Sequence, residues 1–317
     1  MLKPALLERL DAKAAGVAAP REAPVRAEYI RDTVADRDFG VVEKPLTTWE
    51  KLYNKGWLRK CFILAMLAII WEIYARRLNS PLLFPTLTET LDAFWGGVSG
   101  PNFWKTYIPA GDILQKALNS VRLLLQGYAV GLFLAMVFTA FAMTSQIGND
   151  LLETLTSMFN PLPAIALLPL SLIWFGLGDK SIIFVLVHSV LWAVALNTHS
   201  GFKSVSNTLR MVGRNYGLGG VSYVTRILIP AAFPSILTGL KIGWAFAWRT
   251  LIAAELVFGA TSGKGGLGWY IYENKNLLDI PAVFAGLFTV IMIGLLVENL
   301  IFRNIEAATV KKWGMQN

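Results

Sequence analysis

The chain has 317 residues, of which 55% are hydrophobic and only 16% are charged, and its mean hydropathy is +0.51. This composition excludes an ordinary soluble domain and indicates an integral membrane protein. The net charge of +8 does not indicate nucleic-acid binding, because the basic residues gather at the ends of apolar segments, where they contact lipid headgroups and set orientation.

The N-terminal region is polar and charged, and we expect no cleavable signal peptide, because the first apolar run begins only near Leu58. Residues 1–48 show no sustained apolar periodicity and predict a mobile polar tail. Residues 49–60 predict an amphipathic helix in the lipid headgroup region. Its apolar residues recur at helical intervals and are Trp49, Leu52, Tyr53 and Trp57.

Six segments are apolar enough to cross a bilayer, which takes about 20 helical residues. They are 58–77, 118–143, 152–176, 181–200, 233–258 and 282–302. The first is the weakest, because its uncharged stretch ends at Glu72. We therefore predict an all-α polytopic membrane protein with six transmembrane helices. A short helix is expected near 87–95, in the long connection between the first two spans.

Lys and Arg are concentrated on one side of this topology, which predicts that side to be cytoplasmic. The segment 201–232 contains four basic residues and no acidic one. With six spans, the N-terminal flank and the C-terminal tail, 304–317, fall on the same side and are also basic. Arg76 and Arg77 fall on the other side and weaken the case slightly.

The connection between the fourth and fifth spans predicts two short helices joined by a glycine turn. Ser204–Leu218 forms the first, Gly217, Gly219 and Gly220 end it, and Val221–Ile229 begins the second. Such a compact protrusion suits a groove on another protein. The alternative is an ordinary basic loop that only sets orientation.

Within this loop, nine residues separate Gly217 from Ile227, and Pro230 follows. This spacing resembles the cytoplasmic "EAA" loop of ATP-binding-cassette (ABC) importer permeases. The chain also resembles the nitrate/sulfonate/taurine permeases over about 58–303. The similar stretches are 160–170 (NPLPAIALLPL), 174–178 (WFGLG), 229–240 (IPAAFPSILTGL) and 265–268 (GGLG).

The resemblance implies a type I ABC importer permease-like domain over 61–303 in the cell inner membrane, with a coupling loop at 201–230. It implies docked ATPase subunits on separate chains, an extracytoplasmic substrate-binding protein and a second permease copy. The chain itself is expected to be no enzyme, with no catalytic residue and no cofactor. The implied ATPase-coupling residues are Arg210, Met211, Gly213, Arg214, Gly217, Ile227 and Pro230.

One departure from the family pattern affects this loop. The opening Glu-Ala-Ala triplet is here Met211, Val212 and Gly213, so the acidic side chain is missing. Glycine and proline still define the shape, and Arg210 or Arg214 could substitute in the contact. By resemblance, the cargo is a small anion such as a sulfonate, taurine, nitrate or an aromatic carboxylate; vitamin precursors are also possible.

Span five contains charges, and each charge at the bilayer centre costs about 2.5–3.5 kcal/mol on insertion scales. Arg249 lies close to mid-span, and Glu255 follows six positions later, about 600° of rotation, so the two lie on different faces. Our hypothesis is that Arg249 faces the pathway and favours anions. The alternative is a structural ion pair with Glu298, or with Glu255 of a neighbouring chain.

Span three contains Asn160, Pro161, Pro163 and Pro169, which predict a kink. Freed backbone carbonyls are tolerated in a membrane only where protein or a water-filled cavity faces them, so the kink is expected to line the pathway. A packing kink without substrate contact is the alternative. The candidate pathway residues are therefore Asn160, Pro163, Arg249 and Glu255.

The remaining motifs do not indicate catalysis. His188 is expected to be a hydrogen-bonded packing residue, and its distance in sequence from His199 predicts no metal site. The glycine-rich segment 259–268 lacks the Walker spacing. Two other classes of protein stay open: a self-powered secondary transporter, which would be expected to show repeats, and a membrane-embedded enzyme, which would need a titratable cluster.

Overall fold

The computed structural model describes residues 53–99, 112–258 and 265–314, and in these residues every regular element is a helix. The prediction for 1–48 and the first four residues of the predicted segment 49–60 lie outside the described residues, and 56–60 form the start of α3. The chain divides into two compact units, 1–60 and 61–317, and the second contains all the described helices except the start of α3.

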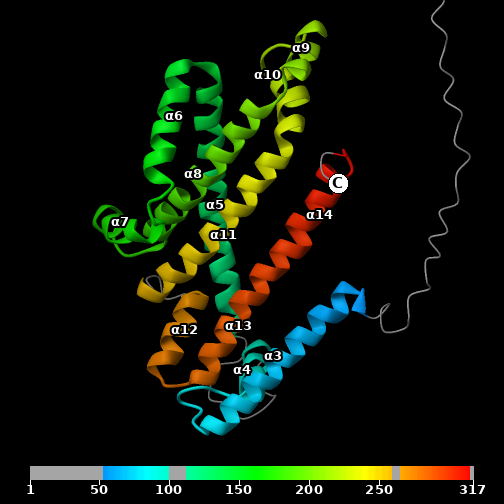
Figure 1. Cartoon of the computed structure of the whole chain (residues 1–317). Coiled ribbons are helices and arrows are strands. Elements are labelled where there is room, and N and C mark those ends of the chain that lie inside the picture. Colours follow the sequence, from blue (N-terminus) through cyan, green and yellow to red (C-terminus); the bar gives the residue numbers. More distant parts are fainter. Residues whose placement is uncertain (1–52, 100–111, 259–264, 315–317) are drawn as a thin grey trace, which may run out of the picture. The chain divides into compact units, whose positions relative to one another are not determined.

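The helices follow the chain in the colour order of Figure 1. Their bounds are α3 Gly56–Leu78, α4 Leu87–Ser99, α5 Asp112–Thr144, α6 Gln146–Phe159, η1 Ala164–Leu167, α7 Leu168–Phe175, α8 Asp179–Ser204, α9 Asn207–Asn215, α10 Gly220–Tyr223, η2 Val224–Leu228, α11 Ile229–Phe258, α12 Leu267–Asn276, α13 Ile280–Leu296, η3 Val297–Phe302, α14 Arg303–Glu306 and η4 Ala307–Lys311.

Four helical runs in the described residues are long and apolar enough to cross a membrane. They are Asp112–Thr144, Asp179–Ser204, Gly220–Val257 and Ile280–Lys311, and a fifth is present if α6 and α7 together count as one span. The helical membrane architecture is confirmed. The count of six stays a prediction, since α3 is not among these runs.

The predicted third span is not a straight helix. The pair formed by α6 and the Ala164–Phe175 segment is bent by 91°. Asn160 is the last residue bonded into α6, its N–H donating to Thr156 O, and Pro161 and Pro163 follow at once. Neither proline has an N–H to donate to a carbonyl of α6, so two prolines this close end the helix and redirect the chain.

Helix α8 is the centre of the bundle, and 61% of its most apolar window is buried. Glycines on its two neighbours allow close approach: Gly127 and Gly131 of α5 face Leu186 and Val190 of α8, and Gly239 and Gly243 of α11 face the next turns of α8 around Val194. Small residues four apart are a common means of packing helices in membranes.

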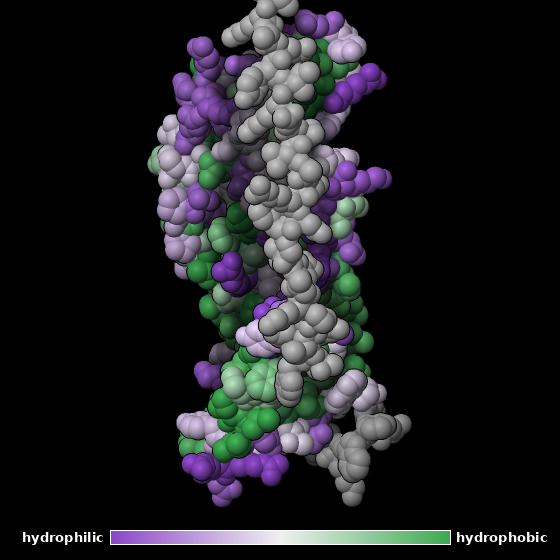
Figure 2. Space-filling view, turned by 45° about the vertical axis from the view of Figure 1, so that its right-hand side comes forward, coloured by the Kyte–Doolittle hydropathy of each residue, from purple (hydrophilic) through white to green (hydrophobic). Residues whose placement is uncertain are grey.

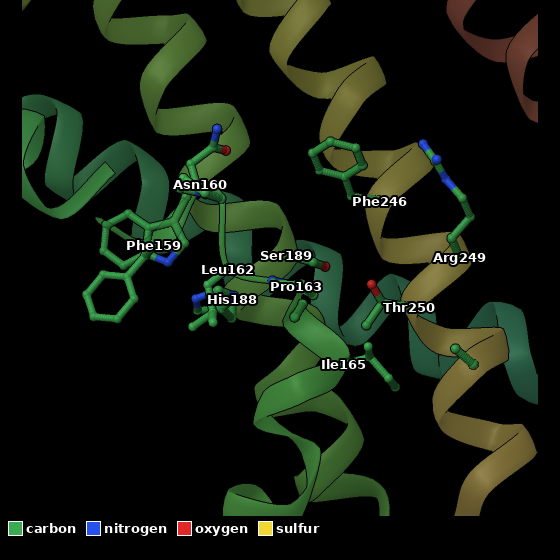
Figure 3. A pocket seen from close by; sticks show the side chains of 14 residues that line it. Phe159, Asn160, Leu162, Pro163, Ile165, His188, Ser189, Phe246, Arg249 and Thr250 are labelled. Carbon is green, nitrogen blue, oxygen red and sulfur yellow. The ribbon is translucent and has the colours of Figure 1, made fainter. Parts of the chain in front are cut away.

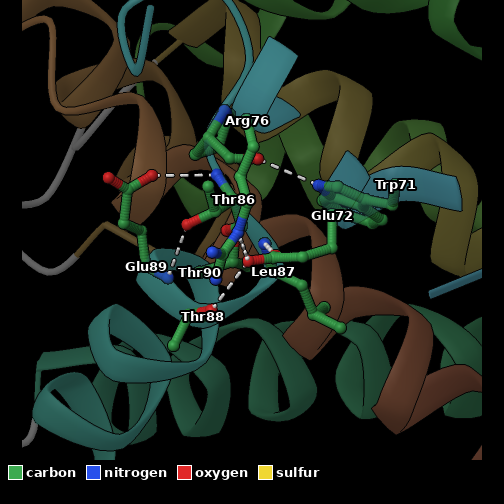
Figure 4. Close-up of polar contacts among 9 residues, drawn as sticks. Trp71, Glu72, Arg76, Thr86, Leu87, Thr88, Glu89 and Thr90 are labelled. Carbon is green, nitrogen blue, oxygen red and sulfur yellow. Dashed lines mark hydrogen bonds and ion pairs between the residues drawn. The ribbon is translucent and has the colours of Figure 1, made fainter. Parts of the chain in front are cut away.

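The contact between α3 and α4 gives a role to Glu72, the charge that ends the uncharged stretch of the first predicted span. Glu72 accepts hydrogen bonds from the Leu87 N–H, at 2.9 Å, and from Arg76 Nε, at 2.7 Å (Figure 4). The Trp71 indole donates to Pro85 O at 2.9 Å. Glu72 therefore satisfies the N-terminus of α4, a helix that confirms the prediction near 87–95.

The last helix continues beyond the predicted end of span six at 302, through η3, α14 and η4 to Lys311. Lys241 Nζ, on α11, donates to Glu306 Oε2 at 2.6 Å, and Phe233 packs edge-on against Trp313. On the face shown in Figure 2, hydrophobic residues form a band in the lower half of the view, with hydrophilic residues below it and others along the upper half.

Candidate functional site

The segment 201–230, predicted to be a coupling loop, forms one end of the bundle, around α9 and α10 (Figure 1). Ser206 begins α9 by accepting from the Leu209 N–H, and Gly217 ends the turn after it with φ +68°. The first short helix is confirmed with narrower bounds. The second is not separate, because α10, η2 and α11 form one helical run, so the chain enters span five without a break.

A small buried cluster fixes this loop to the bundle. Its fully buried members are Phe202, Val205, Leu228 and Ala232. Gly213 of α9 also lies against the Tyr223 ring, and a Cβ there would come within 2.8 Å of that ring and 3.1 Å of Ile227 Cγ1. The glycine in the altered triplet therefore lets the two helical segments touch, which a larger side chain would prevent.

Arg210 is engaged within the chain. Its guanidinium donates to Phe202 O at 2.6 Å and to Val205 O at 3.1 Å. These carbonyls belong to the C-terminal end of α8, where unsatisfied carbonyls favour a positive charge. Arg210 thus caps α8, and Arg214 is the exposed basic residue of α9.

Large apolar side chains cover the outside of the loop. Tyr216 is 80% exposed, Val221 78% and Met211 57%, whereas Ile227 and Pro230 are partly buried. Exposed apolar groups on a rigidly held protrusion, with a basic residue beside them, are typical of a protein-docking surface.

A pocket of about 320 Å³ lies at the break between α6 and α7, where that turn faces α8 and α11. It contains three of the four predicted pathway residues, Asn160, Pro163 and Arg249. Figure 3 shows Arg249, Phe246 and Thr250 of α11 across the pocket from His188 and Ser189 of α8. Proline-broken backbone therefore lines a cavity, as its position in the membrane requires.

Arg249 is exposed and has no carboxylate within ion-pair distance among the described residues. Its Nε donates to Ala245 O of its own helix, and its guanidinium carbon lies 5.4 Å from the centre of the Phe246 ring. No ion pair with Glu298 or Glu255 of the same chain forms in the described structure, so its positive charge has no carboxylate partner there.

Glu255 lies elsewhere. It is 3% exposed and does not line the pocket, and its carboxylate accepts from the Ser120 hydroxyl of α5 and, at 2.8 Å, from the Gly268 N–H of α12. The Leu267 N–H donates to Ser120 Oγ. A Cβ at Gly266 would collide with both side chains. The glycines of the motif at 265–268 thus leave room for the Glu255 carboxylate and let the backbone come close enough to donate to it.

The pocket also contains residues that the sequence did not single out, among them Trp192 and Thr250. The expectation that His188 is hydrogen-bonded is wrong within the described structure, because both of its ring nitrogens are buried without a partner. No group of three or more His, Cys, Asp or Glu side chains in the described ranges could hold a metal ion.

The helices, the pocket at a proline break and the protruding loop together define a polytopic membrane transport subunit. Residues 127–309, more than half of the chain, match the family described as binding-protein-dependent transport system inner membrane component. The chain belongs to this family, and among its members it is a permease of the nitrate/sulfonate/taurine type.

The alignments with individual relatives cover most of each relative's length. A putative ABC transporter permease of Methanocaldococcus jannaschii is 29% identical over 78% of this chain and 90% of its own. The taurine transport system permease of Escherichia coli is 29% identical over 74% and 82%. The nitrate import permease of Synechocystis is 26% identical over 79% and 88%.

Proposed function

We propose that this chain is the membrane subunit of an ATP-driven, binding-protein-dependent importer, and that its coupling loop receives an ATPase carried on a separate chain. The observation that supports this most strongly is the loop itself. Its base is buried against α8 and α11, while Met211, Tyr216 and Val221 face outward. Such a protrusion can pass the motion of a docked partner to the spans.

The rest of the assembly follows from the family. Two permease copies form the pathway, an external binding protein delivers the cargo, and the loop and both termini lie in the cytoplasm. Basic residues on the loop and at Arg303, Lys311 and Lys312 agree with that orientation. ATP binding on the partner then drives the permease between inward-open and outward-open states.

The cargo is a small anion. Arg249, unpaired in the described structure, is the only charged side chain that lines the pocket, and an isolated positive charge favours an anion there. Two relatives are named for taurine, which carries a sulfonate group, and for nitrate, and an unpaired arginine suits both of these anionic groups.

The test is recovery of the ATPase. Tagged full-length protein is purified in a mild detergent from its host, and bound proteins are identified by mass spectrometry. Wild type is compared with Tyr216→Asp, which changes the outside of the loop, and with Tyr272→Asp, a matched change on α12.

We expect an ATPase subunit with wild type and with Tyr272→Asp, and its loss with Tyr216→Asp. A folded wild type that retains no ATPase, and that transports in proteoliposomes without ATP, would instead establish a secondary transporter.

A further inference from the structure

A shallow groove of about 520 Å³ runs along one face of α5 and shares no residue with the pocket at the α6–α7 break. Gly127, which packs against Leu186 of α8, is two positions, or about 200° of rotation, from Leu125 and from Ala129 of the groove. The groove therefore faces away from α8, the centre of the bundle. Its lining residues recur at helical spacing and are Leu118, Val121, Arg122, Leu125, Gln126 and Ala129.

Two polar side chains lie in this otherwise apolar groove. Arg122 and Gln126 are exposed and four residues apart, and beside them Leu118 is 62% and Leu125 51% exposed. Within the described ranges, neither polar side chain has a hydrogen-bond or ion-pair partner. An unpaired charge and an unpaired amide on the outside of a membrane-spanning helix are costly, so both indicate an occupant from outside the chain.

The position of Arg122 along α5 places it at the boundary of the hydrocarbon core. The residues from Leu123 to Met143 carry no charge and cover about 31 Å at 1.5 Å each, which is the thickness of that core. Ser120, two positions earlier, bonds to Glu255 at the end of α11 opposite the coupling loop. Arg122 therefore lies at that end of α5, and Gln126 lies one turn, about 6 Å, deeper.

This order of side chains matches the order of groups along a glycerophospholipid. A phospholipid places its phosphate at the boundary of the core, its ester carbonyls just below, and its acyl chains within. A guanidinium forms charge-assisted hydrogen bonds with phosphate, and an amide N–H donates to a carbonyl. Leu125 and Ala129 then offer apolar surface to an acyl chain.

The charge in the groove favours a lipid with a net negative headgroup. No carboxylate lines the groove, so the ammonium of a zwitterionic headgroup finds no partner there and compensates its own phosphate instead. Lys116 and Asp112, toward the end of α5, lie 4.0 Å apart and compensate each other. Arg122 is thus the one uncompensated charge at the groove, and it attracts an anionic headgroup.

We propose that this groove of α5 binds an anionic glycerophospholipid of the leaflet opposite the coupling loop, with Arg122 binding the phosphate and Gln126 donating to an ester carbonyl. The site lies outside the pocket and the coupling loop, so it is independent of the cargo and of the ATPase. A second copy of the chain is the other occupant that an exposed helix face could have, and the test distinguishes it.

The test reports which lipid occupies the groove. Cys61 is the only cysteine of the chain, so Cys61→Ser with Ala129→Cys leaves one thiol, at the deep end of the groove, which is labelled with the small fluorophore bimane. Met292→Cys on the same background is the control, because Met292 is 45% exposed on α13 and has no charged or amide side chain within one turn. Full-length proteins are placed in nanodiscs of phosphatidylglycerol and phosphatidylcholine. Quenching is measured with dibrominated acyl chains on one lipid or the other.

We expect position 129 to prefer phosphatidylglycerol over phosphatidylcholine by about three- to fivefold, the effect of one exposed ion pair, and position 292 to show no preference. Arg122→Gln should remove the preference at 129, and Arg122→Lys should retain it. Gln126 is tested with ether-linked phosphatidylglycerol, which has no ester carbonyl. The ester-linked lipid should be preferred by about two- to fivefold, and Gln126→Leu should remove this second preference alone.

The proposal fails if positions 129 and 292 show the same lipid preference, if Arg122→Gln keeps the preference for phosphatidylglycerol, or if Gln126→Leu keeps the preference for ester-linked lipid. It also fails if no brominated lipid quenches position 129 while position 292 is quenched, because protein then covers the groove, as a second copy would. None of these measurements requires an ATPase or transport, so their failure is distinct from that of the proposed function.

Discussion

The Ser120 hydroxyl lies 2.9 Å and 2.8 Å from the two carboxylate oxygens of Glu255, although 135 residues separate them in the sequence. This contact joins α5 to α11. Because the same carboxylate and the same hydroxyl also accept the Gly268 and Leu267 N–H groups, it fixes the start of α12 as well. Glu255 is therefore a structural residue at the end of span five opposite the coupling loop.

Ser120→Ala should destabilise the protein by about 1–3 kcal/mol, because it removes a donor to a buried carboxylate and the acceptor of the Leu267 N–H. The measurement is the thermal unfolding midpoint in detergent. Ser157→Ala is the control, since Ser157 is exposed and bonds only within its own helix. Equal midpoints for the two variants would contradict the role of Ser120.

Gly268→Ala should cost about 1–3 kcal/mol by overpacking, because the added Cβ would meet Glu255 Cβ and the Ile252 backbone oxygen at 2.5 Å and 2.6 Å. Gly96→Ala is the matched control, because open space surrounds Gly96 and alanine favours a helix. Unfolding midpoints should fall for the first variant and stay or rise for the second.

Gly213→Val should disturb the coupling loop without altering the spans. A Cβ at 213 already comes within 2.8 Å of the Tyr223 ring, so the larger side chain must push α9 away. We expect retained folding, measured by size-exclusion chromatography, with reduced ATPase recovery. If Gly213→Val recovers as much ATPase as wild type does, the angle of α9 is unimportant for ATPase binding.

Arg249→Gln should change the charge preference of the pocket. In a protein with Cys61→Ser and Thr250→Cys, whose single thiol lies in the pocket lining, a negatively charged methanethiosulfonate should react more slowly, by at least about threefold, relative to a positively charged one. The ratio of the two rates corrects for general changes in access. Arg249→Lys keeps the charge and should keep the ratio; identical ratios in all three proteins would exclude an electrostatic role.

Glu306→Gln should loosen the C-terminal helix by removing the charge that Lys241 contacts at 2.6 Å. Both side chains are about a quarter exposed, so we expect an effect of about 0.5–1 kcal/mol and faster tryptic cleavage after Lys311. The double variant that exchanges the two residues, Lys241→Glu with Glu306→Lys, should restore resistance to this cleavage. If it is cleaved as fast as Glu306→Gln, the ion pair does not hold the helix.

Local pattern predicted much of the fold. Uninterrupted apolar sequence predicted the helices α5, α8, α11 and α13. The glycine and proline residues of the loop predicted the position of the turn after α9. Helix α12 was missed because Leu267–Asn276 mixes aromatic, charged and amide side chains without a clear apolar period. The prolines of 161–163 predicted a kink, but the 91° bend depends on packing against α8, which local sequence does not contain.

The candidate site was predictable only in part. Arg249 stood out because charge in an apolar span is costly, and the structure places it at a pocket. Glu255 stood out for the same reason, yet its partners come from 120 and 266–268. Trp192 gave no signal, since an aromatic residue in a span is ordinary and only the structure shows that it belongs to the pocket lining.

The run from Gly220 to Val257 is a single helical segment of 38 residues, about 57 Å long at 1.5 Å per residue. Its first residues carry the exposed Val221, and its last turn carries Glu255. A rod of that length converts a tilt of about 5° at the loop into a displacement of about 5 Å at the far end. A partner that binds the loop and tilts this helical run slightly would therefore displace α12 directly, because the same run contacts both of them.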